Sequence, residues 1–191
     1  STKPVLVELF TSQGCSSCPP ADELAGELAN DPNTVVVSFN VDYWDYLGWR
    51  DTLAKPEYSK RQYDYAKTRG DGSVYTPQMV FNGVSHAVGS NRREVKQQIA
   101  EGEKLQRVCE VKLNISKNSV SVEIEKANYQ GEATLWLMAV EPKVLQKIQK
   151  GENAGKDITY VNVVKNLIPA AMWSGEAYKG SWMRDVVMTK G

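Results

Sequence analysis

The sequence predicts an α/β domain followed by a smaller, β-rich domain, and two observations support this. Up to about residue 105, short apolar runs alternate with stretches whose apolar residues recur at the three-to-four-residue spacing of a helix. Beyond Arg107, apolar residues recur at every second position, as they do in half-buried strands. We therefore expect a first domain over residues 1–106 and a second, folded as a small antiparallel β-sandwich, over residues 107–191.

The first three elements are predicted to be a strand, a helix and a second strand. Residues 5–10 form a short run rich in branched and aromatic side chains, and residues 35–41 form another. Between them a helix is predicted to begin near Cys18, because apolar residues recur at helical spacing at Ala21, Leu24, Ala25 and Leu28. Pro19 and Pro20 are tolerated in its first turn, whose N–H groups have no intrahelical partner. A strand, a helix and a strand at this spacing indicate a parallel pair of strands.

Two further helices and a hairpin complete the first domain. The segment 56–69 begins with a proline and is followed by a glycine, which are typical helix boundaries. Residues 74–81 and 84–88 flank an Asn-Gly pair, the strongest short signal for a β-hairpin. Asn91 can cap a last helix, because a glutamate follows it at the capping-box distance of three residues. The predicted order of the domain is therefore β-α-β-α-β-β-α.

The second domain is predicted to consist of strands. Alternating apolar residues indicate strands at 109–115, 120–124, 133–140, 158–168 and 182–188, of which the first two form a hairpin. A basic, glycine-bearing connection is expected at residues 143–156. Cys109 shares its alternating face with Val111 and Leu113, so we expect it to be buried as a small apolar residue rather than to act as a third redox thiol.

The most informative motif is Cys15-Ser16-Ser17-Cys18, between the first strand and the first helix. The two-residue gap lets the two sulfurs meet, and the free N–H groups and dipole at a helix N-terminus stabilise a thiolate. Cys15, at the helix entrance, is therefore expected to be the acidic, attacking thiol, and Cys18 to be shielded. A static disulfide and half of a zinc site are the alternatives, but a CxxC motif beside a β-α-β pattern favours redox chemistry.

Composition narrows the classes of partner. Lys plus Arg and Asp plus Glu number 23 each, without a basic or acidic block, so nothing indicates binding to nucleic acid or to an anionic membrane. No apolar stretch approaches the roughly 20 residues of a membrane span. Three cysteines are too few for a disulfide scaffold, which favours a working CxxC pair. Because the chain opens at Ser1 without methionine, we expect either a mature form whose leader was removed or a trimmed chain.

An aromatic-rich segment, residues 42–49, follows the second strand. Its large rings include Tyr43, Trp44 and Trp49, and they either bury the segment against the sheet or contact a substrate. Loops that follow parallel strands leave the same edge of a sheet, so we expect this segment to share a rim with the CxxC motif.

Two further side chains carry open alternatives. Glu8 is an acid inside an apolar strand, where it could accept a proton near the cysteine pair, or occupy an edge position or an ion pair. His86 is the only histidine, and it could join Cys15 and Cys18 as a ligand for copper(I) or zinc. A lone histidine on a hairpin strand is more often a surface or packed residue, which disfavours the metal interpretation.

The order of elements, the CxxC motif at the start of the first helix and a proline just before the third strand together resemble the thioredoxin superfamily over residues 4–105. More narrowly, the stretches 7–22, 41–45 and 76–78 are similar to an uncharacterised bacterial family of secreted or periplasmic thioredoxin-like proteins. That family also carries a β-rich C-terminal half.

The resemblance implies roles for particular residues. It makes Cys15 the attacking cysteine, Cys18 the resolving one, and Pro77 a cis-proline against the disulfide, whose neighbour Thr76 offers its backbone to a substrate chain. Two departures matter: Gly14 stands where thioredoxin has a tryptophan, and the intervening dipeptide is Ser-Ser instead of Gly-Pro. The redox potential and the partner therefore do not carry over.

Together these observations predict a thiol–disulfide oxidoreductase that acts, without a cofactor, on the disulfide of a protein or a small molecule, in the periplasm or outside the cell. One alternative is binding of copper or zinc through the CxxC motif. Another is a non-catalytic binding module with a structural disulfide, which would use the aromatic segment and the C-terminal domain as its surface. A redox titration separates the three hypotheses.

Overall fold

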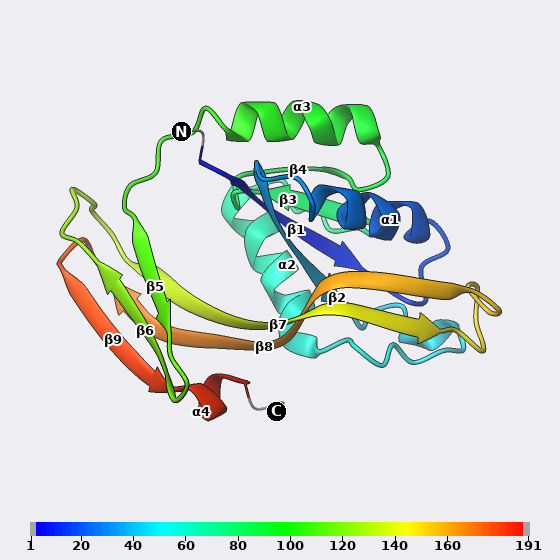
Figure 1. Ribbon diagram of the computed structural model, residues 1–191. Coiled ribbons are helices and arrows are strands. Elements are labelled where there is room, and N and C mark those ends of the chain that lie inside the picture. Colours follow the sequence, from blue (N-terminus) through cyan, green and yellow to red (C-terminus); the bar gives the residue numbers. More distant parts are fainter. Residues whose placement is uncertain (1–2, 189–191) are drawn as a thin grey trace. The chain divides into compact units, whose positions relative to one another are not determined.

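The structure, a computed structural model that describes residues 3–188, contains a six-stranded sheet in the order β4-β3-β1-β2-β8-β7 (Figure 1). A separate three-stranded sheet has the order β5-β6-β9. The elements up to residue 104 are β1 (Val5–Thr11), α1 (Pro19–Leu28), β2 (Thr34–Asn40), the 3-10 turn η1 (Asp45–Leu47), α2 (Pro56–Arg69), β3 (Gln78–Phe81), β4 (Ser85–Val88) and α3 (Arg92–Gly102). The elements that follow are β5 (Val111–Ile115), β6 (Ser119–Ile124), β7 (Ala133–Lys147), β8 (Asp157–Trp173), β9 (Tyr178–Met183) and α4 (Arg184–Met188).

The chain divides into two compact units. The first contains the residues up to Lys104 together with Glu141–Val163, and the second contains Leu105–Val140 and the residues from Val164 onward. The chain leaves the first unit close to the boundary expected at residue 106, but residues 141–163 return to it. The units therefore differ from the two contiguous domains expected from the sequence, because β7 and β8, with 15 and 17 residues, each run from one unit into the other.

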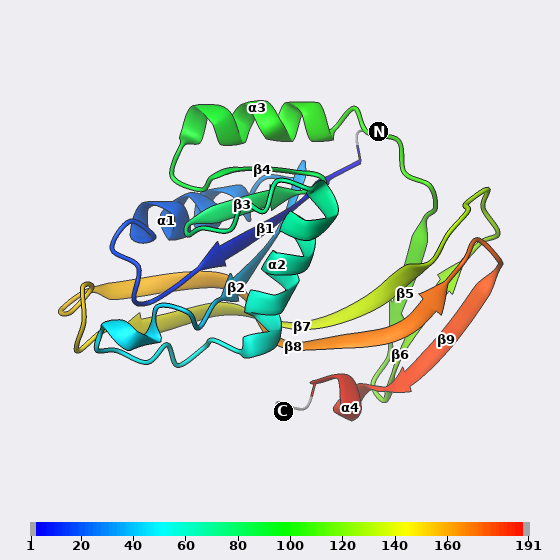
Figure 2. The same ribbon diagram turned by 180° about the vertical axis from the view of Figure 1, so that it is seen from behind.

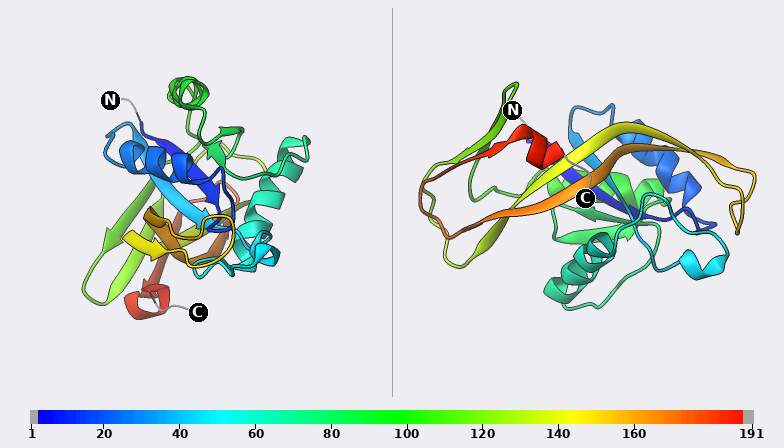
Figure 3. Two further views of the ribbon diagram at one scale, coloured as in Figure 1. Left: turned by 90° about the vertical axis from the view of Figure 1, so that its right-hand side faces the viewer. Right: turned by 90° about the horizontal axis from the view of Figure 1, so that it is seen from below.

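The first unit has the expected β-α-β-α-β-β-α order, with helices on both faces of its sheet (Figures 2 and 3). Alternate side chains of β1 point to opposite faces. Val7 and Leu9 belong to the apolar core formed with α1 and α3. Phe10 points the other way, where it stacks on Phe39 of β2 and meets the ring of Tyr65 of α2 edge-on. The sheet is thus a central layer between α1 and α3 on one side and α2 on the other.

The strand ends position the CxxC loop. β1 pairs in parallel with β2 from Val5 opposite Thr34 to Thr11 opposite Asn40, so both strands end at the same edge of the sheet. β8 continues the sheet by parallel pairing with β2, and β7 lies beside β8. The loops after β1 and β2 therefore leave the sheet together, as expected from the sequence.

The second unit is built from two β layers. β5, β6 and β9 pair antiparallel, and Val120, Val122 and Ile124 of β6 are buried. These side chains pack in one apolar cluster with Leu137 of β7 and Trp173 of β8. The unit is therefore a small antiparallel sheet packed on a second β layer, as predicted.

Parts of the C-terminal half differ from the sequence predictions. β7 runs to Lys147, so the first residues of the expected connection 143–156 are strand. Residues 184–188 form the short helix α4 instead of the end of a strand. Cys109 is half-buried rather than buried and takes no part in a disulfide. None of the helices within residues 3–188 is long and apolar enough to cross a bilayer.

β5 also departs from its expected burial. Val111, Leu113 and Ile115 stand opposite the buried residues of β6, yet their side chains are 48 to 62% exposed. β5 is an edge strand, and all five of its residues are exposed. The alternation of apolar residues in the sequence predicted which side chains of β5 share a face, but not that these side chains are exposed.

Candidate redox site

Cys15 and Cys18 form a disulfide in the loop between β1 and α1, with their Cα atoms 5.4 Å apart. Cys18 is the N-cap of α1, which places the pair at the N-terminus of the helix as predicted. In this oxidised state Cys15 is only 4% exposed and Cys18 is fully buried, whereas Ser16 and Ser17 are exposed. The Ser17 hydroxyl lies 3.4 Å from Cys15 Sγ. The two serines therefore form the solvent-facing part of the motif.

A buried glutamine anchors the loop that precedes the disulfide. The backbone N–H of Gln13 donates to Asp51 Oδ2 over 2.8 Å, and its side-chain Oε1 accepts from Trp49 Nε1 over 2.8 Å. Gln13 is fully buried, and burial raises the pKa of Asp51, against the effect of the hydrogen bonds that this carboxyl accepts. The segment that follows η1 thus holds the CxxC loop from one side.

A third loop, which sequence reasoning missed, reaches the same backbone. Asn153, in the connection between β7 and β8, is fully buried and donates from Nδ2 to the carbonyl oxygens of Gln13, over 2.9 Å, and Cys15, over 2.8 Å. Lys156 Nζ donates to Asn153 Oδ1 over 3.1 Å. The only sequence signal was an asparagine between Gly151 and Gly155, both of which have positive φ in the structure.

The aromatic segment lies beside the CxxC loop, as predicted. A Cβ placed on Gly14 would lie 3.2 Å from both the Cβ and the carbonyl oxygen of Trp44. Trp44 Nε1 also donates to Thr76 Oγ1 over 2.7 Å, and the Thr76–Pro77 peptide bond is cis, as the resemblance implies. Trp44 therefore links the CxxC loop to the loop that carries the cis-proline. Tyr43 donates from its hydroxyl to Gln62 Oε1 over 3.0 Å, at the start of the same segment.

The close approach of Trp44 explains why a glycine stands before the motif, and it yields a prediction. Gly14→Ala should lower the free energy of unfolding by about 1 kcal/mol, because the added methyl group must displace the Trp44 backbone by a few tenths of an ångström. Gly26→Ala is the matched control. Gly26 lies within α1, and a Cβ added there would meet only Val161 Cγ1, at 3.8 Å. Gly26→Ala should therefore raise the free energy of unfolding by about 0.5–1 kcal/mol, because alanine favours the helix more than glycine does. Urea denaturation of the three proteins measures both, and equal stabilisation by the two alanines would contradict the packing argument.

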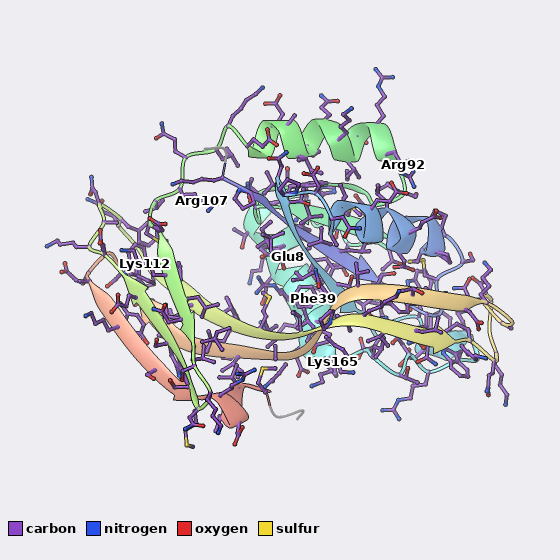
Figure 4. The ribbon with its side chains drawn as sticks, viewed as in Figure 1. Glu8, Phe39, Arg92, Arg107, Lys112 and Lys165 are labelled. Carbon is purple, nitrogen blue, oxygen red and sulfur yellow. A yellow bond between two sulfur atoms is a disulfide. The ribbon has the colours of Figure 1, made fainter. Side chains whose placement is uncertain are left out.

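Glu8 is held in an ion pair on the face of the sheet that α2 covers (Figure 4). Arg61 Nε donates to Glu8 Oε2 over 2.7 Å, and the Tyr65 hydroxyl donates to Glu8 Oε1 over 2.5 Å. The guanidinium also lies 5.6 Å from the centre of the Phe39 ring. Both carboxylate oxygens thus have donors, which favours the ion pair among the alternatives that the sequence left open. Arg61 itself was not singled out by the sequence pattern.

A second buried acid, Asp22, lies in the first turns of α1. It follows Cys18 by four residues in α1, a spacing that places two side chains on one face of a helix. Thr11 Oγ1 donates to Asp22 Oδ1 over 2.6 Å, whereas Asp22 Oδ2 has no hydrogen-bond partner among the described residues. Burial raises the pKa of Asp22 well above its usual value, against the effect of the Thr11 hydrogen bond. A pocket of about 300 Å³ adjoins it, lined also by Pro19, Glu23 and residues 157–159.

His86 lies in β4 with a partner at each ring nitrogen. The Tyr75 hydroxyl is 2.8 Å from Nδ1, and Asp71 Oδ2 is 3.1 Å from Nε2. Over residues 3–188, no group of three or more His, Cys, Asp or Glu side chains is arranged to hold a metal ion. The contacts of His86 are those of the packed histidine that the sequence also allowed.

Comparison with known proteins agrees with this architecture. The chain resembles the crystal structure of a protein from Agrobacterium tumefaciens, structural genomics target AtR35, with 31% identity and a TM-score of 0.82, over 97% of this chain and 81% of that one. It also shares the fold of HBP35 of Porphyromonas gingivalis, with 13% identity and a TM-score of 0.60, over 97% of this chain and 65% of that one. The comparison with curated proteins gave no significant match. A family profile described as a protein of unknown function (DUF1223) matches residues 6–189, so the chain belongs to the DUF1223 family.

Proposed function

We propose that the protein is a thiol–disulfide oxidoreductase in which Cys15 and Cys18 cycle between dithiol and disulfide. The observation that carries the proposal is the disulfide at the N-terminus of α1, in a β-α-β unit. The free N–H groups and the dipole of this helix end favour a thiolate at Cys15 once the disulfide is reduced.

The reaction proceeds in two exchange steps. The Cys15 thiolate attacks one sulfur of a substrate disulfide, so that a Cys15–substrate mixed disulfide forms and the other substrate sulfur leaves as a thiolate. Cys18 then loses its proton and attacks Cys15 Sγ, which forms the Cys15–Cys18 bond and releases the second substrate thiolate. The released thiolates take protons from solvent. The substrate gains two electrons and the protein loses them, and the reverse sequence oxidises a dithiol substrate.

The substrate is proposed to bind on the rim around the serines of the motif. Trp44 borders both the CxxC loop and Thr76, and Tyr43 and Trp49 lie in the same segment. Aromatic side chains of this kind supply contact area at a low entropic cost. A protein or small-molecule disulfide in an oxidising compartment, the periplasm or the cell exterior, fits this rim and the redox pair.

Trapping experiments test the proposal. Cys18→Ser should accumulate mixed disulfides with a model substrate such as oxidised glutathione or a disulfide-bonded peptide, because the resolving thiol is missing. With Cys109 also replaced by serine in both motif variants, Cys15→Ser should accumulate none, since Cys18 is fully buried. Cys109→Ser, outside the motif, is the control and should exchange like the natural protein. Mass spectrometry reads all three, and adducts formed equally by both motif variants would exclude the assigned roles.

The reduction potential of the pair decides the direction of electron flow. A value near or above about −180 mV would make the protein an oxidant or isomerase, and one near roughly −270 mV would make it a reductant. Titration against glutathione or dithiothreitol buffers measures the potential. A pair that stays oxidised across both ranges would be a structural disulfide.

A further inference from the structure

The connection between β7 and β8 is part of the redox site, although it lies about 140 residues beyond the CxxC motif in the sequence. Residues 141–163 belong to the same compact unit as the CxxC loop. Figure 1 shows this connection at the end of the sheet where β1 runs into the loop before α1. The first unit therefore has its redox loop completed by a segment from the C-terminal half of the chain.

The side-chain amide of Asn153 makes three hydrogen bonds at this site. Its amide nitrogen has two N–H groups, and these donate to the carbonyl oxygens of Gln13 and Cys15. Its amide oxygen accepts from the ammonium group of Lys156. The orientation of the amide follows from these partners, because two carbonyls can only accept and an ammonium group can only donate. The side chain is fully buried, so water does not replace these bonds.

The connection is built to hold Asn153 in place. The backbone N–H of Ile148 donates to the carbonyl of Lys156, and the N–H of Gly155 donates back to the carbonyl of Ile148 over 2.7 Å. Gly151 packs against the Trp49 side chain, where a Cβ would approach within 3.2 Å of Trp49 Cβ. Trp49 in turn binds Gln13, so both sides of the CxxC loop are fixed by neighbouring segments.

The hydrogen bonds of Asn153 also affect the electrostatic potential at the Cys15 thiol. The carbonyl oxygens of Gln13 and Cys15 place partial negative charges in the loop that carries Cys15 Sγ, and such charges disfavour a thiolate. The N–H groups of Asn153 offset these partial charges, and the ammonium group of Lys156 polarises the amide further in the same direction. The hydrogen bonds from Lys156 to Asn153 and from Asn153 to the Cys15 carbonyl thus reduce the negative potential that this carbonyl places in the loop of the attacking sulfur.

We propose that Asn153, supported by Lys156, is a positioning residue that fixes the Cys15 backbone and makes the Cys15 thiol more acidic and more reactive. The inference rests on the proposed thiol–disulfide exchange and assigns a role in it to the C-terminal half of the chain. Neither residue touches the substrate, and their effect reaches it through Cys15.

The test measures the Cys15 thiol directly, without a substrate. In a Cys18→Ser, Cys109→Ser background, the rate of alkylation by iodoacetamide is followed as a function of pH, together with thiolate absorbance at 240 nm. Asn153→Ala should raise the pKa of Cys15 by about one unit, and so slow alkylation about tenfold at a pH below both values. Lys156→Gln, at an exposed position, leaves Asn153 in place and should slow alkylation about twofold, an effect that high salt removes.

The controls separate this inference from the proposed function. Lys150→Gln removes a like charge from an exposed position of the same connection and should leave the Cys15 titration unchanged. If Cys15 exchanges disulfides normally while Asn153→Ala and Lys156→Gln titrate like the parent, only the positioning role is overturned, even where stability falls. If Asn153→Ala does not fold, the test depends on Lys156→Gln. A rate of Cys15 alkylation that equals that of the parent at low salt would then overturn the positioning role. If the parent Cys15 itself titrates near the ordinary value of about 8.5 and does not exchange, the proposed function fails first.

Discussion

Asp22→Asn is expected to raise the free energy of unfolding of the oxidised protein by about 1–3 kcal/mol at pH 8, with little effect near pH 3. Asp22 is buried by α1 and the sheet, and burial raises the pKa of its carboxyl well above the usual value. In the unfolded chain this pKa returns to about 3.9. The folded state therefore binds more protons than the unfolded state above about pH 4, and the free energy of unfolding falls as the pH rises from there toward the folded pKa.

Asparagine removes this pH dependence without a change of shape. Its Oδ1 can still accept the hydrogen bond from Thr11 Oγ1, and it carries no charge to desolvate. Urea denaturation from pH 3 to pH 9 should give a difference in the free energy of unfolding between Asp22→Asn and the parent that increases with pH. Because the disulfide stays intact, neither cysteine of the motif titrates in this range. Asp51, whose pKa is also raised by burial, should contribute to the pH dependence that remains in the variant.

Glu23→Gln is the matched control, since it alters an exposed acid at the next position of α1. It should change the free energy of unfolding by less than about 0.5 kcal/mol at every pH. A gap for Asp22→Asn that is the same at pH 3 and pH 8 would mean that its carboxyl is not held neutral by burial. Asp22→Asn also allows a test of whether Asp22 affects the attack of Cys18 on the mixed disulfide, because Asp22 lies one helical turn beyond Cys18.

The elements that the sequence predicted well are those fixed by local signals. α2 runs from Pro56 to Arg69 because proline suits a first turn, and Gly70, with φ of 80°, adopts the left-handed conformation that closes the helix. The side chain of Asn91 accepts the N–H of Glu94, the expected cap of α3. The position of the CxxC motif at a helix start follows from the same kind of local information. Helix boundaries and caps of this kind are determined by a few residues that are neighbours in the sequence.

The features that the sequence did not reveal depend on contacts between distant segments. Asn153 donates to the Cys15 carbonyl across a sequence separation of 138 residues, and no periodicity marks such a pair. The burial of Asp22 depends on which strand covers the start of α1. The exposure of Leu113, despite perfect alternation, depends on where β5 lies in its sheet. Burial and long-range hydrogen bonds are properties of the assembled fold, whereas alternation reports only which side chains share a face.

Arg61→Met is expected to lower the free energy of unfolding by about 3–5 kcal/mol at pH 7, because it leaves the carboxylate of Glu8 buried without its charged partner. Glu8 has no exposed surface, so water cannot solvate the charge. The loss should shrink at low pH, where the unpaired carboxyl takes up a proton. Lys60→Met, in the same helix, is the control, since its ion pair with Asp64 is largely exposed and should cost less than about 1 kcal/mol.

The double variant Glu8→Gln, Arg61→Met should recover most of the lost stability, because no buried charge then remains unpaired and the introduced amide oxygen can still accept from the Tyr65 hydroxyl. The pair also decides the role of Glu8. If Glu8 serves as an ion-pair partner, Glu8→Gln should leave the pH profile of disulfide exchange unchanged while altering stability. A loss of the acidic limb of that profile in a folded Glu8→Gln protein would instead make Glu8 the proton acceptor, in spite of its position on the face of the sheet opposite α1.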